Sequence, residues 1–252
     1  MGGHVHVAGV AGVGMSALAQ ALRWSHDRVT GSDRFHDRGQ DLPIFAALRG
    51  AGIEIVPQDG SAVDAQTTAV VYSTAIEDQN PDFAAARRAG VPLKHRAAVL
   101  AELARGQTLL AVAGTAGKTT TAGMLGWVLE QLGADPTVIN GGALVDWAQA
   151  RNVGNVRRGG VGAPWVVEVD ESDRSLLNFH PEWSILTNIS QDHFTLAEVQ
   201  DLFRQYAARV RTGLVCGAGV APALGPQPAR IIEALAQPEW IGNGYEIARR
   251  GY

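Results

Sequence analysis

The sequence has very little cysteine and no long apolar run. Its 252 residues include one cysteine, Cys216, and no uninterrupted apolar stretch reaches membrane-spanning length. A single cysteine cannot form an internal disulfide, which favours a reducing compartment such as the cytoplasm. The N-terminal residues show neither a basic segment nor an apolar stretch followed by a cleavage site. We therefore expect a cytoplasmic protein with no secretory signal and no membrane insertion.

Charged residues are also scarce, at 18% of the chain with a formal net charge of -4. A nucleic-acid-binding surface needs an excess of basic residues, so we expect no nucleic acid as a partner. Lysine is the scarcest charged type, because only Lys94 and Lys118 occur among the 21 basic residues. The position of each lysine is therefore informative.

Apolar residues make up 46% of the sequence, which is typical of globular proteins. Short apolar segments alternate with helix-like segments along almost the whole chain. The expected strands are His4–Val10, Arg28–Ser32, Ile53–Val56, Ala69–Ser73, Leu109–Ala113, Thr137–Asn140, Trp165–Val169, Trp183–Ile189 and Leu214–Cys216. The expected helices are Met15–Trp24, Pro81–Arg88, Arg96–Arg105, Lys118–Leu132 and Ala197–Val210. This alternation predicts an α/β fold with parallel sheets covered by helices.

The chain divides most naturally after residue 107. Residues 1–107 contain a complete set of alternating elements and predict a Rossmann-like parallel-sheet domain. Residues 108–252 begin with a new strand and a second Gly-rich turn, and they predict a domain similar to the P-loop nucleotide-binding proteins. Within the second domain, the polar and Gly-rich segment 150–163 is expected to be an exposed loop.

The first Gly-rich turn carries Gly9, Gly12 and Gly14 between an expected strand and an expected helix. Glycines let the backbone approach a ligand closely, and the helix N-terminus that follows favours a phosphate. Asp33 ends the next strand, where an acid commonly binds a ribose hydroxyl. The spacing is G-x-x-G-x-G, which is not the dinucleotide fingerprint G-x-G-x-x-G. The turn therefore indicates a nucleotide-type ligand, and a tight turn without a ligand is the alternative.

The second Gly-rich turn is the most specific feature of the sequence. Residues 109–121 read LLAVAGTAGKTTT, in which Lys118 is one of the two lysines of the chain. In such a turn backbone N–H groups hold phosphates, the lysine neutralises β/γ charge and the following threonine ligates Mg²⁺. Residue 112 is valine, so the common G-x-x-x-x-G-K spacing is not met. The position between a strand and a helix nevertheless predicts an ATP site.

Two further segments place polar side chains after expected strands. Residues 165–173 read WVVEVDESD and end in four carboxylates, of which Glu168 is the first. Carboxylates beside a P-loop can hold Mg²⁺ directly or through water, although some of them would only cap a loop. His193 lies just past another expected strand, where a ligand or acid–base role and a purely structural role are both open.

Taken together, these segments resemble the Mur ligases. The resemblance rests on motifs in the family's order, which are GVAGVGMSALA, TGSD, VVYSTAIEDQNPDFAAARRAGVP, RAAVLAEL, AVAGTAGKTTT, VVEVDESD and TNISQDH. They cover residues 4–193 and are most similar to the branch that joins UDP-N-acetylmuramate to L-alanine. The resemblance implies a cytoplasmic, ATP- and Mg²⁺-dependent ligase of peptidoglycan precursor synthesis that works through an acyl phosphate.

The resemblance also implies roles for individual residues. Residues that would bind the UDP-sugar substrate are Gly9, Gly12, Gly14, Asp33 and Ser73, with Asn155 and Arg157 on a loop that faces the substrate. Residues that would bind the ATP phosphates are Gly114, Thr115, Gly117, Lys118, Thr119 and Thr120. Magnesium would be held by Thr119, Glu168 and His193, and Lys118, Glu168 and His193 would be the catalytic residues.

The sequence departs from the family pattern at several points. Ala116 stands in the P-loop where the L-alanine-adding branch usually has histidine, and Ala11 replaces one glycine of the first turn. The 252 residues would account for the first two domains of a three-domain ligase, which predicts either a fragment or a short chain that relies on a partner chain. Two alternatives follow: a non-catalytic paralogue that binds UDP-sugar or ATP, and a Rossmann-type dehydrogenase, against which the second turn argues.

Overall fold

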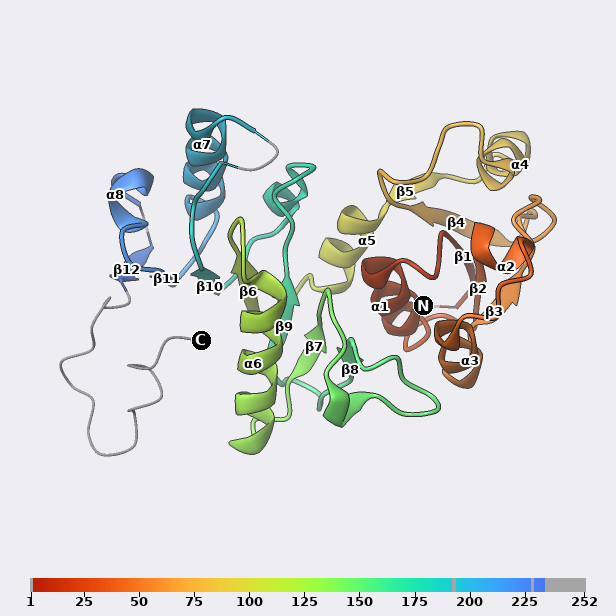
Figure 1. Cartoon of the computed structure of the whole chain (residues 1–252), viewed down its shortest axis with the longest axis horizontal. Helices are drawn as coiled ribbons and strands as arrows, with labels where there is room; N and C mark the ends of the chain where they lie inside the picture. The colour runs from red at the N-terminus through yellow and green to blue at the C-terminus, as the bar shows by residue number, and fades with distance from the viewer. Residues whose placement is uncertain (1, 192–193, 228, 234–252) are drawn as a thin grey trace.

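The computed structural model describes residues 2–191, 194–227 and 229–233. They form two α/β domains that lie side by side, one around each Gly-rich turn (Figure 1). The predicted fold class is confirmed, because each domain has a sheet of mainly parallel strands with helices packed on it. Among the helices of the described residues, none is both long enough and apolar enough to cross a membrane.

The first domain is built on a five-stranded parallel sheet of order β3-β2-β1-β4-β5. Its elements are β1 (His4–Ala8), α1 (Val13–Leu22), β2 (Arg28–Ser32), α2 (Arg34–Asp37), α3 (Pro43–Gly50), β3 (Glu54–Val56), β4 (Thr67–Tyr72), α4 (Pro81–Ala89), β5 (Leu93–His95) and α5 (Arg96–Leu103). The strand order reverses at β1, so a crevice opens at the carboxyl ends of β1 and β4. Open α/β sheets bind ligands at such a crevice.

The second domain is built on a seven-stranded sheet of order β12-β11-β10-β6-β9-β7-β8, in which only β8 is antiparallel to its neighbour. Its elements are β6 (Leu109–Ala113), α6 (Lys118–Gln131), β7 (Thr137–Ile139), the 3₁₀ turn η1 (Val145–Trp147), β8 (Val156–Arg157), β9 (Trp165–Glu168), the 3₁₀ turn η2 (Ser175–Asn178), β10 (Trp183–Leu186), α7 (Leu196–Ala207), β11 (Gly213–Cys216), α8 (Ala221–Leu224) and β12 (Arg230–Glu233). The Gly-rich turn after β6 therefore lies near the middle of the sheet.

Side chains of β1 alternate between the two faces of the first sheet. Val5 and Val7 pack with residues of α1, α3 and α5 in one core, whereas Ala8 packs with residues of α4 in another. Helix α4 begins with an Asn80 cap and Pro81, which suit the first turn of a helix. The first sheet is consequently covered on both faces.

A row of polar side chains lies on the α4 face of the first sheet. Thr67 bonds to His4 over 3.0 Å, and Thr30 bonds to both His4 and His6 over 2.8 Å. His6 Nε2 lies 3.1 Å from Asp82 Oδ2, and both side chains are fully buried. Burial, followed by the charge of Arg28, lowers the pKa of His4. The row thus favours neutral imidazole at His4.

The core of the second sheet extends into the first domain. Helix α6 covers one face of this sheet, while α7 packs on the other face. The α7 face also receives small side chains from α1 and α5, among them Ala17, Ala21 and Ala97, in one continuous buried cluster. Small residues let two helices approach closely, so α1 and α5 of the first domain pack directly against the second (Figure 1).

Buried amides join the two domains along α1. Gln20 Nε2 donates to Asn155 Oδ1 over 3.0 Å, and Gln20 Oε1 accepts from Val153 N over 3.1 Å. Asn155 Nδ2 donates to Val13 O and to Ser16 Oγ, each over 2.9 Å. Each terminal amide atom of Gln20 and Asn155 therefore has a partner, which is what burial of an amide requires.

The expectation of an exposed loop over residues 150–163 is wrong for its central part. Strand β8 lies within this segment, and Asn155 and Val156 are buried. The polar and Gly-rich composition suggested exposure because the partners of these residues are far away in the sequence. Asn155 and Gln20, for example, are 135 positions apart.

The lowered pKa of His4 predicts how stability changes with pH. A histidine whose pKa is lower in the folded state binds fewer protons when the protein is folded. The neutral histidine therefore stabilises the folded state fully above its unfolded pKa of 6.5, and this stabilisation is lost as the pH falls below that value. We expect the free energy of unfolding to fall between about pH 7.5 and pH 5.5, and His4→Gln to flatten that slope. Urea unfolding at each pH measures it. An unchanged slope in His4→Gln, with exposed His180→Gln as the control, would contradict the assignment.

Truncation of Asn155 tests the contact between the domains. Asn155→Ala leaves buried partners of the amide unsatisfied, so we expect a loss of about 1–3 kcal/mol in the free energy of unfolding. Gln205→Ala serves as the control, because Gln205 is exposed and its amide bonds only to Asp201 within α7. Chemical unfolding curves compare the two variants, and equal stabilities would show that the Asn155 contacts contribute nothing.

Candidate functional site

The second Gly-rich turn connects β6 to α6 as predicted. Gly114 has φ +134°, and a Cβ at this position would overlap the Thr187 hydroxyl. Gly117 has φ +78° and caps the N-terminus of α6 without a side chain. Both positions lie in the backbone region that favours glycine. The turn therefore leaves the first N–H groups of α6 open to an anion, as a phosphate-binding turn requires.

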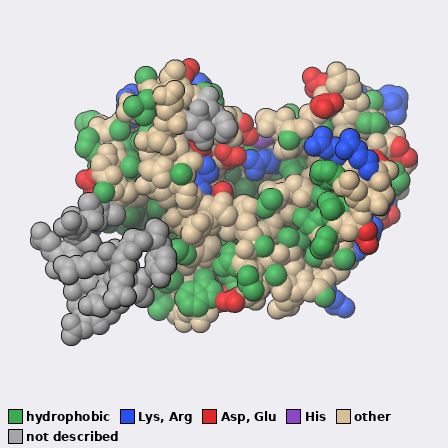
Figure 2. Space-filling view, in the orientation of Figure 1, with side chains coloured by type: hydrophobic (Ala, Val, Ile, Leu, Met, Phe, Trp, Pro, Cys, Tyr) green, Lys and Arg blue, Asp and Glu red, His purple; other side chains and the backbone are tan. Residues whose placement is uncertain are grey.

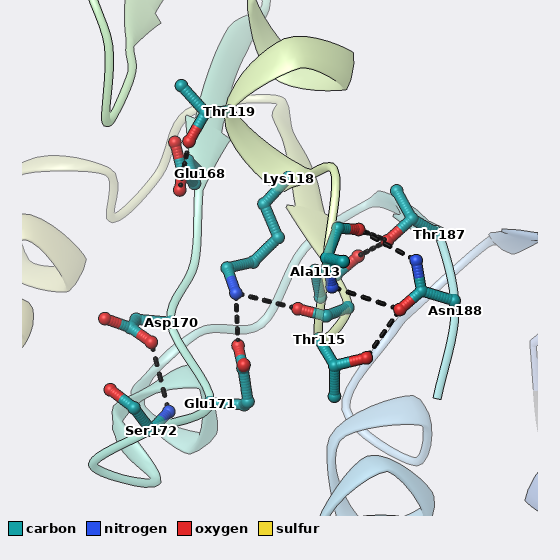
Figure 3. A network of polar contacts seen from close by, with 12 residues as sticks. Ala113, Thr115, Lys118, Thr119, Glu168, Asp170, Glu171, Ser172, Thr187 and Asn188 are labelled. Atoms are coloured by element: carbon teal, nitrogen blue, oxygen red, sulfur yellow. Dashed lines mark hydrogen bonds and ion pairs between the residues drawn. The ribbon is translucent and has the colours of Figure 1, made fainter. Parts of the chain in front are cut away.

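Residues that follow β10 hold this turn in place (Figure 3). Asn188 accepts through Oδ1 from Ala116 N over 3.0 Å and donates through Nδ2 to Ala116 O over 2.9 Å. Thr187 donates to the same carbonyl over 2.7 Å, and Thr115 bonds to both Asn188 and Ser190. The sequence drew attention to this segment only for His193. Thr187 and Asn188 in this segment were the residues that could have indicated hydrogen bonds to the P-loop.

Lys118 lies between the turn and the acidic segment after β9 (Figure 3). Its Nζ donates to Gly114 O over 2.9 Å and to Glu171 Oε2 over 2.7 Å. Glu171 is buried, and this burial raises its pKa although the charge of Lys118 acts in the opposite direction. The pair therefore places one cation at the mouth of the phosphate-binding turn.

Thr119 and Glu168 form the oxygen-rich part of the site. The Thr119 hydroxyl donates to Glu168 Oε1 over 3.0 Å, and Gly141 N donates to Glu168 Oε2 over 2.7 Å. In the described part of the chain, no three His, Cys, Asp or Glu side chains cluster in a way that could hold a metal. Mg²⁺ commonly takes one or two protein oxygens plus phosphate oxygens and water, so the hydroxyl and the carboxylate fit it. The third predicted ligand, His193, lies outside the described residues.

The first Gly-rich turn borders a cavity of about 410 Å³ at the crevice between β1 and β4. Gly9, Gly12, Asp33 and Ser73 line it, so the structure brings these predicted residues together. The carboxylate of Asp33 accepts from Ala11 N over 3.0 Å and from Phe35 N over 2.9 Å. Asp33 therefore shapes the turn and caps α2. Lining residues that the sequence did not suggest are Arg34, Arg38 and Gln58.

A second cavity, of about 340 Å³, lies between the two domains. Its lining includes Gly12, Gly14 and Ser73 from the first domain and Glu168 and Asp170 from the second. Figure 2 shows a hollow between the domains in which acidic and basic side chains gather. The first Gly-rich turn thus lies on one side of this cleft, and the other side carries Glu168, the hydrogen-bond partner of Thr119.

Arg96 is a charged residue of this cleft that the sequence did not single out. Its Nη2 donates to Asp170 Oδ2 over 2.8 Å, and the preceding His95 lies 3.4 Å from Asp173. Burial alone would raise the pKa of Asp170, but hydrogen bonds from Ser172 and the charges of Arg96 and Lys118 outweigh it and lower the pKa. Arg96 begins the expected helix Arg96–Arg105, but strand β5, which places it at the carboxyl edge of the first sheet, was not predicted.

The sequence predicted that Asn155 and Arg157 face the substrate, but in the structure both side chains bond to other residues of the chain. Asn155 lies in the buried contact between the domains, and Arg157 pairs with Glu130 and Asp135, each over 2.8 Å. Neither side chain lines the cavity at the first turn or the interdomain cleft. The described residues that line these two cavities therefore do not include Asn155 or Arg157.

Comparisons with known proteins match both domains. The model of the Mur ligase family catalytic domain matches residues 4–108, and the model of the Mur ligase middle domain matches residues 112–201. A UDP-N-acetylmuramate–L-alanine ligase of Gloeobacter violaceus is 40% identical over 223 residues, which are 84% of this chain and 44% of that protein. The chain thus spans less than half the length of this relative.

Solved structures give the same picture. The crystal structure of the UDP-N-acetylmuramate-alanine ligase MurC from Thermotoga maritima is 28% identical, with a TM-score of 0.77 over 91% of this chain and 53% of that chain. The ligase for UDP-N-acetylmuramate and L-alanyl-gamma-D-glutamyl-meso-diaminopimelate from Neisseria meningitides shares the fold, with a TM-score of 0.79 at 23% identity over 92% of this chain and 78% of that chain. These matches show that the chain belongs to the Mur ligase family.

Proposed function

We propose that this chain provides the nucleotide-binding domains of an ATP-dependent ligase that joins UDP-N-acetylmuramate to L-alanine. The domain boundary is placed at residues 107 and 108, with the UDP-sugar in the first domain and ATP in the second. Relatives that carry this activity in their names support the choice of substrates. A third domain or a partner chain would complete the amino-acid site. The single, buried cysteine is compatible with the cytoplasm.

One observation carries the proposal: the first Gly-rich turn borders a cleft that lies next to the second turn. Gly12 and Gly14 line one side of it, and Glu168, which bonds to Thr119 at the start of α6, lines the other. A sugar nucleotide on the first turn and ATP on the second would therefore meet. Such proximity is what phosphoryl transfer between two bound substrates needs.

The first step of the proposed reaction is phosphoryl transfer. An oxygen of the muramoyl carboxylate attacks the γ-phosphorus of ATP, the bond to the β,γ-bridging oxygen breaks, and ADP leaves. Lys118 is placed to stabilise the negative charge that spreads over the phosphate oxygens. Thr119 and Glu168 would hold Mg²⁺, which neutralises phosphate charge when bound.

The second step is amide formation. The amine of L-alanine attacks the carbonyl carbon of the acyl phosphate, and inorganic phosphate leaves from the tetrahedral intermediate as the amine loses a proton. The acyl phosphate is already activated, so the step needs no protein nucleophile. The residues assigned here to the site accordingly bind and orient the substrates and stabilise charge.

Substitution of Lys118 tests the proposal directly. We expect Lys118→Ala to weaken binding of a non-hydrolysable ATP analogue by about tenfold to a hundredfold, because a charge-assisted contact to the phosphates is lost. Lys94→Ala is the matched control, since the only other lysine pairs with exposed Glu102. Calorimetric titration measures both variants. Unchanged affinity in Lys118→Ala would refute the assignment of the second turn.

The same titrations separate ligase from binding protein. The proposal expects the wild-type chain to bind both the ATP analogue and UDP-N-acetylmuramate. It also expects release of ADP that depends on UDP-N-acetylmuramate and L-alanine once the third domain is supplied. Tight binding of both nucleotides without ADP release under those conditions would instead select the non-catalytic alternative, for which Ala116 in the P-loop is the specific observation.

Substitution of Glu168 tests the proposed Mg²⁺ site. Glu168→Gln keeps the size of the side chain but removes the charge, so we expect it to reduce the Mg²⁺-dependent gain in nucleotide affinity by about tenfold or more. Affinity for ADP is measured with Mg²⁺ and with a chelator, and Glu102→Gln is the exposed control. If the Mg²⁺-dependent gain were the same in Glu168→Gln and wild type, Glu168 would not hold the ion.

A further inference from the structure

A separate cavity, of about 170 Å³, lies where the C-terminal end of α1 meets the segment around β8. The first domain contributes Arg23 and Trp24 to its lining, and the second domain contributes Arg151 and Arg158. Helix α1 has 10 residues, so its two ends lie about 15 Å apart. The cavity is therefore distinct from the first Gly-rich turn, which precedes the other end of α1.

The backbone fixes the position of Arg151. Gln149 and Asn152 exchange two backbone hydrogen bonds, of 2.9 and 3.0 Å, and these close a tight turn that contains Arg151. A Cβ added at Gly50 would overlap the carbonyl oxygen of Ala150, so the turn packs directly on the end of α3 in the first domain. The Arg151 side chain consequently starts from a defined point at the contact between the domains.

Arg158 likewise lies between two residues that are held in place. The preceding residue, Arg157, pairs with Glu130 over 2.8 Å. The following residue, Gly159, donates its N–H to Thr137 Oγ1 over 3.0 Å. The backbone on both sides of Arg158 is thus tied to the second domain.

The lining of this cavity carries positive charge that no acid balances. Among the described residues that line it, three are arginines and none is aspartate or glutamate. The whole chain has a formal net charge of -4, so a general excess of basic residues does not explain the cluster. Like charges around a small space repel one another, and an anion between them removes that repulsion.

The three guanidinium groups also have N–H donors available. Nε and Nη1 of Arg23 donate to two backbone carbonyls, over 3.2 and 2.8 Å, which leaves Nη2 without a partner among the described residues. Arg158 Cζ lies 6.0 Å from the centre of the Trp24 ring. In the described part of the chain, neither Arg151 nor Arg158 forms a side-chain hydrogen bond or an ion pair. A planar fork of such donors matches the oxygens of a phosphate.

We propose that this cavity binds a phosphate group, held by Arg23 of the first domain and by Arg151 and Arg158 of the second. The cavity admits one phosphate group with a few waters, since each water needs about 30 Å³. Because the ligand would touch both domains, it would stabilise the contact that Gln20 and Asn155 make beside it. The inference goes beyond the proposed function and does not depend on it.

NMR titration of the labelled 252-residue chain with inorganic phosphate tests the proposal, with ionic strength held constant by chloride. The Trp24 indole N–H reports on this cavity, and the Gly117 amide reports on the P-loop, which also attracts phosphate. The test variant carries Arg151→Gln and Arg158→Gln together. We expect it to weaken the phosphate affinity reported by Trp24 by about tenfold or more, because charge-assisted hydrogen bonds are lost. The affinity reported by Gly117 is expected to stay unchanged.

Arg88→Gln is the matched control, because Arg88 is an exposed arginine in the last turn of α4 and does not line the cavity. Its phosphate affinity at Trp24 is expected to stay within about twofold of wild type. Thermal unfolding separates ligand binding from a purely structural role. We expect phosphate to raise the melting temperature less in the double variant than in Arg88→Gln. An equal loss of stability with and without phosphate would mean that the arginines only support the domain contact, which overturns the proposal.

Other outcomes also decide the question. A Trp24 signal that does not respond to phosphate, or an unchanged affinity in the double variant, overturns the proposal and leaves the assignment of the P-loop intact. If the double variant does not fold, Arg151→Gln alone at its exposed turn provides the comparison, with an expected loss of about threefold or more. Ribose 5-phosphate identifies the source of the phosphate. Tighter binding than inorganic phosphate at Trp24 supports a phosphorylated small molecule, and weaker binding supports the free ion.

Discussion

The direct packing of the first domain against the second sheet is the constraint on which the site depends. Ala17 and Ala21 of α1 lie in the same buried cluster as the strands of the second domain, and Gln20 donates to Asn155 across the contact. Helix α1 begins directly after Gly12, so this contact also sets the position of the first Gly-rich turn. The contact therefore places the first turn next to Glu168, which bonds to Thr119 at the second turn.

The packing of the domains also positions two ion pairs in and beside the cleft. Lys118 at the second Gly-rich turn lies against buried Glu171, and Arg96 in the cleft lies against the more exposed Asp170, so these two cations are paired in different surroundings. A buried pair that is broken leaves a costly uncompensated charge, while a partly exposed pair can exchange its partner cheaply. The difference suits Lys118 to a fixed place at the phosphate turn.

Much of the site could be predicted from the sequence, because its signals are local. A strand, a Gly-rich turn, a Lys-Thr pair and a helix follow one another along the chain, and so do the acids after β9. The amide partners of Asn155 and the ion pair of Arg96 could not be predicted in this way. The partners of Asn155 lie 135 to 142 positions away and that of Arg96 lies 74 positions away, and such separations leave no periodic or spacing signal.

The sequence by itself determined the α/β class and the two Gly-rich turns, and it placed Lys118 and Thr119 at the second turn. These features depend on backbone conformation and hydrophobic periodicity over a few residues. Only the tertiary structure decided that the first turn borders a cleft next to the second turn, that Asn155 is buried between the domains and that Arg96 bridges the cleft. The physical reason is that packing of small helix residues and pairing of buried amides act between segments that are distant in the chain.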